Sequence, residues 1–124
     1  MRKPVPEPKS LAELRELANK LYPGVTWVAK PKHSNASIFR VEAKRSSGMN
    51  RIATYELAYH AFRGTDRYEL DIYGYGRRSS RLLTAHANDP RDLRAVVKTD
   101  ALDRIQRGNE LLCVLGYLVT KKEY

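Results

Sequence analysis

Apolar residues in the first part of the chain recur at helical spacing. The apolar stripe of this segment consists of Leu11, Leu14, Ala18 and Leu21, with Leu17 beside it. Ser10 and Glu13 match the Ser-x-x-Glu pattern of a capping box, and Pro23-Gly24 is a stop signal. The pattern therefore predicts a helix over residues 11–21. Residues 1–9 are basic, polar and proline-rich, which predicts a flexible tail before it.

The hydrophobic period changes to two in the middle of the chain. Segments of alternating apolar and polar residues cover 25–29, 39–44, 53–61 and 68–73, and a weaker one covers 81–85. Such alternation, rich in aromatic and β-branched residues, indicates strands with one buried face. The predicted connections, 31–35, 45–50, 63–66 and 76–80, are short, and short connections favour antiparallel neighbours. We expect a meander of four to five antiparallel strands.

The last third of the chain returns to helical spacing. Asp89 is a good N-cap and Pro90 suits the first helical position. The predicted apolar face consists of Leu93, Val96, Val97, Ala101 and Ile105, and Gly108 is the expected end. Residues 109–119 form either a last helix or a strand. The apolar run 111–119 belongs to the monomer core or pairs two chains in a homodimer. The fold class is α+β: an N-terminal helix, the meander, and one or two C-terminal helices packed on the sheet, in one domain over 10–124.

Positive charge is concentrated in one stretch of the chain. The formal net charge is +9, and residues 30–51, with six Lys/Arg and one acid, carry +5 of it. Lys30 and Lys32 begin this stretch and are candidate nucleic-acid-binding residues. A concentrated basic segment attracts polyanions. The charge therefore favours nucleic acid as the partner, with an acidic protein surface or solubility alone as the alternatives.

Two basic segments share one composition, Lys44-Arg45-Ser46-Ser47 and Arg77-Arg78-Ser79-Ser80-Arg81. In a meander the second and fourth connections fall at the same end of the sheet, so the two segments should form one cradle for phosphate. Guanidinium groups bind phosphate oxygens bidentately, and serine hydroxyls add neutral donors. The candidate phosphate-binding residues here are Lys44, Arg45, Arg51, Arg77, Arg78 and Arg81. Tyr73 and Tyr75 lie on the strand face opposite Ile72, where they are either stacking platforms for bases or covered core residues.

The predicted plan, a strand meander followed by a helix over about residues 25–120, is similar to that of single-strand-binding domains of the Whirly and PUR type, without a shared motif. The resemblance implies binding of single-stranded or structured nucleic acid. The leading hypothesis is a small non-catalytic nucleic-acid-binding protein. The alternative is a small inhibitor or adaptor, such as a phage or mobile-element protein, that blocks a larger nucleic-acid-processing complex.

Other chemistries have weaker patterns. Glu42-Ala43-Lys44 resembles the strand end of a restriction-type nuclease site, which needs an upstream acid, here Glu7, Glu13 or Glu16. Glu69 and Asp71 suit a solvated strand face. The three histidines, His33, His60 and His86, have no metal-ligand spacing, and His60 is expected at the surface or on an edge strand. We therefore expect no metal, no cofactor and no catalysis.

Features near both ends of the chain predict the cellular compartment of the protein. Prolines follow Met1-Arg2-Lys3 where a secretory signal needs an apolar stretch, and no window has the roughly 18 apolar residues of a membrane span. The single cysteine, Cys113, lies in an apolar run and is expected to be a buried hydrophobe. These features favour a cytoplasmic protein without a membrane partner.

Overall fold

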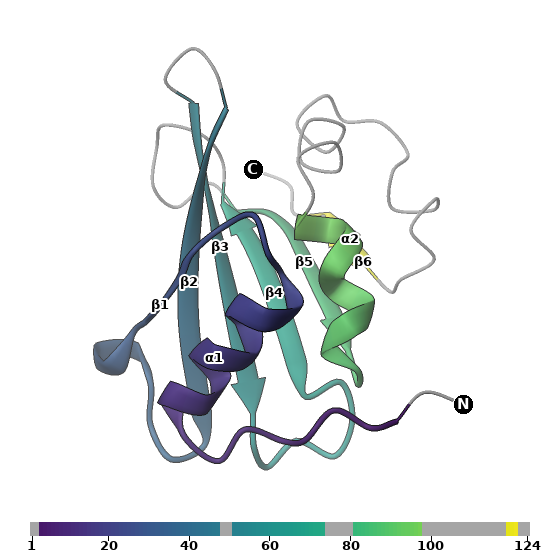
Figure 1. Ribbon diagram of the computed structural model, residues 1–124. Helices are drawn as coiled ribbons and strands as arrows, with labels where there is room; N and C mark the ends of the chain where they lie inside the picture. The colour runs from purple at the N-terminus through teal and green to yellow at the C-terminus, as the bar shows by residue number, and fades with distance from the viewer. Residues whose placement is uncertain (1–2, 48–50, 74–80, 98–118, 122–124) are drawn as a thin grey trace.

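The computed structural model describes residues 3–47, 51–73, 81–97 and 119–121 (Figure 1). One α-helix, α1 (Leu11–Leu21), precedes the sheet. The strands are β1 (Trp27–Ala29), β2 (Ile38–Ser47), β3 (Arg51–His60), β4 (Tyr68–Tyr73), β5 (Arg81–Ala87) and β6 (Val119–Lys121). Two short 3-10 helices, η1 (Pro31–His33) and η2 (Pro90–Leu93), follow β1 and β5, and η2 continues into α2 (Arg94–Val97).

The sheet is an antiparallel meander. Its strand order is β1-β2-β3-β4-β5-β6, and each strand pairs with its neighbours in sequence. The strands β1 to β5 confirm the predicted antiparallel meander and the α+β class. The short strand β6 adds to the free edge of β5 through Ala85↔Val119. Of the segment 109–119, for which helix and strand were both open, only Val119 is described, and it is in a strand.

The predicted helix α1 is confirmed together with its cap. Ser10 is the N-cap in extended conformation, and its Oγ accepts a hydrogen bond from the Glu13 backbone N–H at 3.2 Å. The Glu13 carboxylate accepts from the backbone N–H of Lys9 at 3.2 Å, one residue earlier than in a standard capping box. Gly24, with φ 105°, lies just after the helix in the left-handed region that glycine adopts without strain.

The hydrophobic core lies between one face of the sheet and the two helical segments. In β3 the buried residues Tyr55, Leu57 and Tyr59 alternate with the half-buried residues Thr54, Glu56 and His60, and Ala58, on the same face as these three, is buried as well. Figure 1 shows α1 and α2 against the same side of the sheet. The core residues that α1 contributes are Leu14, Ala18 and Leu21. The other side of the sheet carries polar residues, so the period-two pattern correctly divides the strands into a core face and a polar face.

The segment after β5 begins as predicted. The Asp89 side chain accepts a hydrogen bond from the Arg91 backbone N–H at 2.9 Å, and Pro90 takes the first position. Leu93, Val96 and Val97 are buried in the core. The first turn is a 3-10 helix rather than an α-helix. The further predicted residues Ala101, Ile105 and Gly108, the second C-terminal helix and the proposed homodimer run 111–119 (Val119 apart) lie outside the described residues.

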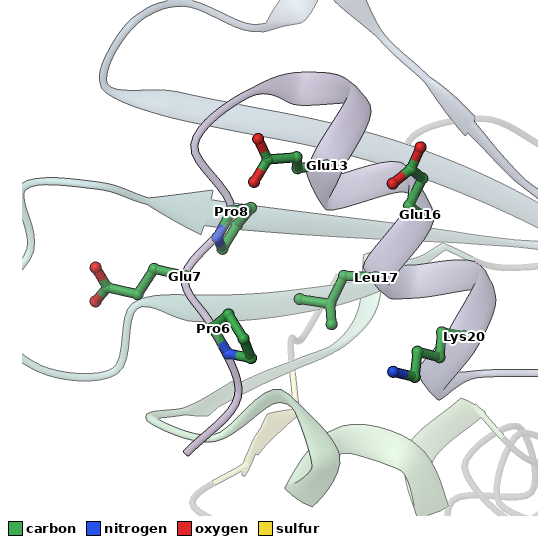
Figure 2. A pocket seen from close by; sticks show the side chains of 7 residues that line it. All are labelled: Pro6, Glu7, Pro8, Glu13, Glu16, Leu17 and Lys20. Atoms are coloured by element: carbon green, nitrogen blue, oxygen red, sulfur yellow. The ribbon is translucent and has the colours of Figure 1, made fainter. Parts of the chain in front are cut away.

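The N-terminal segment runs along α1 and contacts both η2 and the β3–β4 connection. Arg91 Nη2 donates to the Lys3 carbonyl at 2.7 Å, and Glu7 forms an ion pair with Arg67. Pro8 is buried. Figure 2 shows Leu17 pointing from α1 toward Pro6 and Pro8, across a pocket also lined by Glu7, Glu13, Glu16 and Lys20. These contacts place residues 3–9 against the domain.

Within the residues that the structure describes, no helix combines the length and the apolar composition needed to cross a membrane.

Candidate nucleic-acid interface

The described strand ends next to both basic segments lie at one end of the sheet. The connection between β2 and β3 and the connection between β4 and β5 are alternate turns of the meander, so they share an end. The strand ends that flank them are Ser47, Arg51, Tyr73 and Arg81. We call this the hairpin end. Three of the predicted site residues, Tyr75, Arg77 and Arg78, belong to the connection 74–80, which lies outside the described residues.

A single cross-strand row joins three of the predicted site residues. Lys44 pairs with Thr54, Thr54 with Tyr73, and Tyr73 with Arg81. At 4.7–4.9 Å per strand, the row spans about 14 Å from β2 to β5. Lys44 is exposed and Tyr73 is half-buried, on the polar face as its parity relative to Ile72 predicts. We call Lys44, Thr54, Tyr73 and Arg81 the hairpin row.

Three predicted loop residues are in a strand instead. The connection 45–50 was expected to be a loop, but β2 continues to Ser47 and β3 already begins at Arg51. Arg45 pairs with Ala53, and Ser47 pairs with Arg51. The prediction of a loop over 45–47 was wrong because Ser and Arg have only weak turn preference, and a paired partner strand decides their backbone conformation.

Lys30 and Lys32 do not join the hairpin end. The Lys30 backbone N–H donates to the Arg40 carbonyl at 3.0 Å, which places it four residues along β2 from Lys44, roughly 13 Å at 3.3 Å per residue. Lys32 is an exposed residue of η1, further toward the opposite end of the sheet. The structure therefore separates these two lysines from the other predicted site residues.

Lys30 instead neutralises a pair of carboxylates. Glu42 and Glu56 are direct cross-strand partners, an arrangement that repulsion between like charges destabilises. The Lys30 Nζ lies 3.3 Å from Glu42 Oε1 and 3.0 Å from Glu56 Oε2. Burial alone would lower the pKa of Lys30, but the hydrogen bonds and charges of Glu56 and Glu42 outweigh it and raise that pKa. The Lys30 ammonium is therefore engaged within the domain.

We expect Lys30→Gln to lower the free energy of unfolding by about 1–2 kcal/mol, because it removes the cation between two facing, partly buried carboxylates, of which Glu56 keeps only the longer ion pair with Arg40 at 3.9 Å. Lys32→Gln is the matched control: it removes the same charge from an exposed site and should change the stability by less than about 0.5 kcal/mol. Urea denaturation of both variants measures the difference. Equal stabilities for the two variants would contradict the structural role of Lys30.

An acidic row lies directly behind the hairpin row. Glu42, Glu56, Asp71 and Thr84 occupy successive strands in register. They lie two residues, or about 7 Å, from the hairpin row in β2, β3 and β4, and three residues from it in β5, where the register shifts. Asp71 was expected on a solvated face, but it is 5% exposed and accepts a hydrogen bond from Thr84 Oγ1 at 2.6 Å. That expectation was wrong because the register places Asp71 in the middle of the sheet, among neighbours that cover it. The polar face therefore carries carboxylates directly behind Lys44 and Tyr73.

The structure also gathers a histidine cluster that the sequence did not indicate. His60 Nε2 and His86 Nδ1 lie 3.7 Å and 3.6 Å from Glu69 Oε1, and Arg63 Nη1 lies 3.6 Å from the same oxygen. His60 was expected at the surface or on an edge strand, but it lies on the inner strand β3 with its side chain 13% exposed. Burial, followed by the charge of Arg63, lowers the pKa of His60. The cluster depends on cross-strand register and has no signature in the sequence.

Two of the acid partners suggested for the nuclease-like Glu42-Ala43-Lys44 are on the wrong side of the sheet, and the third, Glu7, forms an ion pair with Arg67. Val41 and Ala43 face the core beneath α1, so Glu42 and Lys44 face away from α1, which carries Glu13 and Glu16. The carboxylates nearest to Glu42 in register are Glu56 and Asp71 instead. Among residues 3–47, 51–73, 81–97 and 119–121, no three His, Cys, Asp or Glu side chains are grouped to hold a metal ion.

Comparisons of this chain with models of protein families, with curated proteins and with solved structures find no match. The function is therefore inferred from the placement of charge and of aromatic residues in this chain.

Proposed function

We propose that this is a small, non-catalytic nucleic-acid-binding protein that holds the phosphate backbone at its hairpin end. The observation that supports this proposal most strongly is the segregation of charge. Residues 43–55 and 72–88, which form the two hairpins of this end, contain six Lys/Arg and no Asp or Glu. The meander brings both segments to the same end of the sheet.

The two hairpins act on the backbone through complementary chemistry. Arginine forks match phosphate oxygens, and lysine adds a point charge. In the hairpin row, Thr54 lies between Lys44 and Tyr73 and supplies a hydroxyl. In this proposal the aromatic rings for base stacking come from Tyr73 and Tyr75. The acidic row behind them carries three carboxylates, which Lys30 and Arg40 offset only in part, so bound nucleic acid crosses the strands near the hairpin end rather than following them down the polar face.

Salt dependence tests the proposal. If all six cations of the two hairpin segments contact phosphates, the plot of log affinity against log salt has a slope of about −4 on a single strand and about −5 on B-form DNA. Fluorescence anisotropy with labelled oligonucleotides at several salt concentrations measures this slope. Affinity that does not change with salt, or the absence of binding at low salt, would refute the proposal.

The inhibitor or adaptor alternative predicts a different result. A protein partner with an acidic surface would stay bound in a pull-down after thorough nuclease treatment, whereas association through nucleic acid would be lost. A protein that binds such a partner and no oligonucleotide belongs to the alternative class.

A further inference from the structure

The histidine cluster lies on the polar face, further from the hairpin end than the acidic row. A third cross-strand row, two residues beyond the acidic row on each strand, consists of Arg40, Ala58, Glu69 and His86. Glu69 follows Tyr73 along β4 at a distance of four residues, or about 13 Å. A nucleic-acid strand that leaves the hairpin row along the polar face therefore passes the acidic row first and then the histidine cluster.

The formal charge of this part of the polar face depends on the two histidines of the cluster. Beyond the hairpin row, the described residues of this face carry four carboxylates, those of the acidic row and of Glu69. The cations that offset them are Lys30, Arg40 and Arg63. With both histidines neutral, the carboxylates exceed the cations by one, and with both protonated the cations exceed the carboxylates by one. Proton uptake therefore changes the face from one that repels phosphate to one that attracts it.

The cluster holds more cationic groups than its one carboxylate can neutralise. His60 Nε2, His86 Nδ1 and Arg63 Nη1 all lie within 3.7 Å of the same atom, Glu69 Oε1. The charged groups that face the two histidines, besides each other, are Arg40 on β2, Glu69 on β4 and Arg63 in the β3–β4 connection.

Two nitrogen atoms of this region lack hydrogen-bond partners. His60 Nε2 and Arg40 Nε are buried, and no described residue accepts a hydrogen bond from either. A second anion with several acceptor oxygens, such as phosphate, would supply the missing acceptors. The side chains of His86 and Arg63 are 28% and 37% exposed, so such an anion can approach them from solvent.

We propose that the histidine cluster is a second phosphate subsite, which forms when His60 and His86 take up protons, so that a bound single strand extends from the hairpin row along the polar face. This inference rests on the proposed function, because it names how pH regulates binding by the same protein surface. Burial and the charges of Arg63 and Arg40 lower the pKa of His60, which keeps it neutral at neutral pH. A bound phosphate acts in the opposite direction, so proton uptake and phosphate binding strengthen each other, and the affinity rises as the pH falls.

The test measures the affinity for an oligothymidine, whose bases take up no proton in this range, at about pH 7.5 and at about pH 5.5. At 0.15 M salt the affinity should rise about fourfold at the lower pH for one added phosphate neutralisation and about 14-fold for two, and the salt slope should steepen by about 0.7 for each. His60→Asn with His86→Asn should remove this gain, because asparagine takes up no proton. His33→Asn is the matched control: it removes an exposed histidine of η1 and should retain the gain.

Glu69→Gln gives a readout that loss of folding cannot produce. It keeps the shape of the side chain and removes the carboxylate that pairs with Arg63, so it should strengthen binding about fourfold at about pH 7.5 and 0.15 M salt.

Three results would overturn the subsite and leave the proposed function intact. They are an affinity of the unmodified protein that is the same at both pH values, a gain at low pH that persists in the double histidine variant, and the absence of tighter binding by Glu69→Gln. Failure of the unmodified protein to bind the oligothymidine at low salt at either pH would refute both proposals.

Discussion

Replacement of four cations at the hairpin end by glutamine should reduce nucleic-acid affinity by between about two and three orders of magnitude at 0.15 M salt. The variant combines Lys44→Gln, Arg45→Gln, Arg51→Gln and Arg81→Gln. Each lost phosphate contact lowers the salt slope by about 0.7 on a single strand and about 0.9 on B-form DNA. The slope should therefore fall by roughly 3 to 4, and the affinity loss follows from the counterions that are no longer released.

The control variant makes the same change in net charge at residues outside the hairpin end. Lys9, Arg15, Lys20 and Lys32 are exposed and lie outside both hairpin segments. Changing these four to glutamine lowers the net charge by the same amount, so a loss of affinity that depends on total charge would affect both variants equally. A weak effect of the hairpin-end variant, or a comparable effect of the control, would show that the hairpin end is not the binding surface. Thermal unfolding of both variants separates lost binding from lost folding.

Trp27→Ala should lower the free energy of unfolding by about 3–5 kcal/mol. Trp27 is 1% exposed and lies where α1, β1 and β3 meet, with ring centroids 5.7 Å from Tyr22 and 6.3 Å from Tyr55. Its backbone N–H donates to Asn19 Oδ1 at 2.9 Å, which ties β1 to the end of α1. Because small domains are stable by only about 5–15 kcal/mol, the loss is a large share of the total.

Val28→Ala is the matched control for the core variant. Val28 is the next residue of the same strand, but it is 50% exposed on the polar face. Its truncation should cost less than about 0.5 kcal/mol. Chemical denaturation measures both variants. A small effect of Trp27→Ala would mean that β1 and α1 do not share the core described here.

The N-terminal helix and the strand pattern could be predicted because they depend on local chemistry. The Ser10 cap, the apolar stripe from Leu11 to Leu21 and the alternation in β3 are properties of neighbours in sequence. The shared end of the two basic segments also follows from the sequence, since short connections between strands produce a meander. The prediction for residues 45–47 failed at a boundary, where pairing with a partner strand extended β2 past weak turn formers.

Some features of the candidate site could likewise be predicted from the sequence, and others could not. Lys44 and Arg81 share a row with Tyr73 because of the strand register. The periodicity of the sequence indicates the face on which a residue lies, but not the residue with which it pairs. Lys30 had the charge of a phosphate ligand, but the fold pairs it with Glu42 and Glu56, residues that lie 12 and 26 positions away in the chain. A contact over such distances has no local signature.

The sequence by itself determined the class of fold, the two faces of the sheet and the presence of an acid-free, basic hairpin end. These depend on the period of apolar residues and on the length of connections, which neighbouring residues specify. Only the tertiary structure decided that Asp71 is buried and that His60, Glu69 and His86 meet. These follow from strand register and from where each partner strand ends, which are set by packing across the whole sheet.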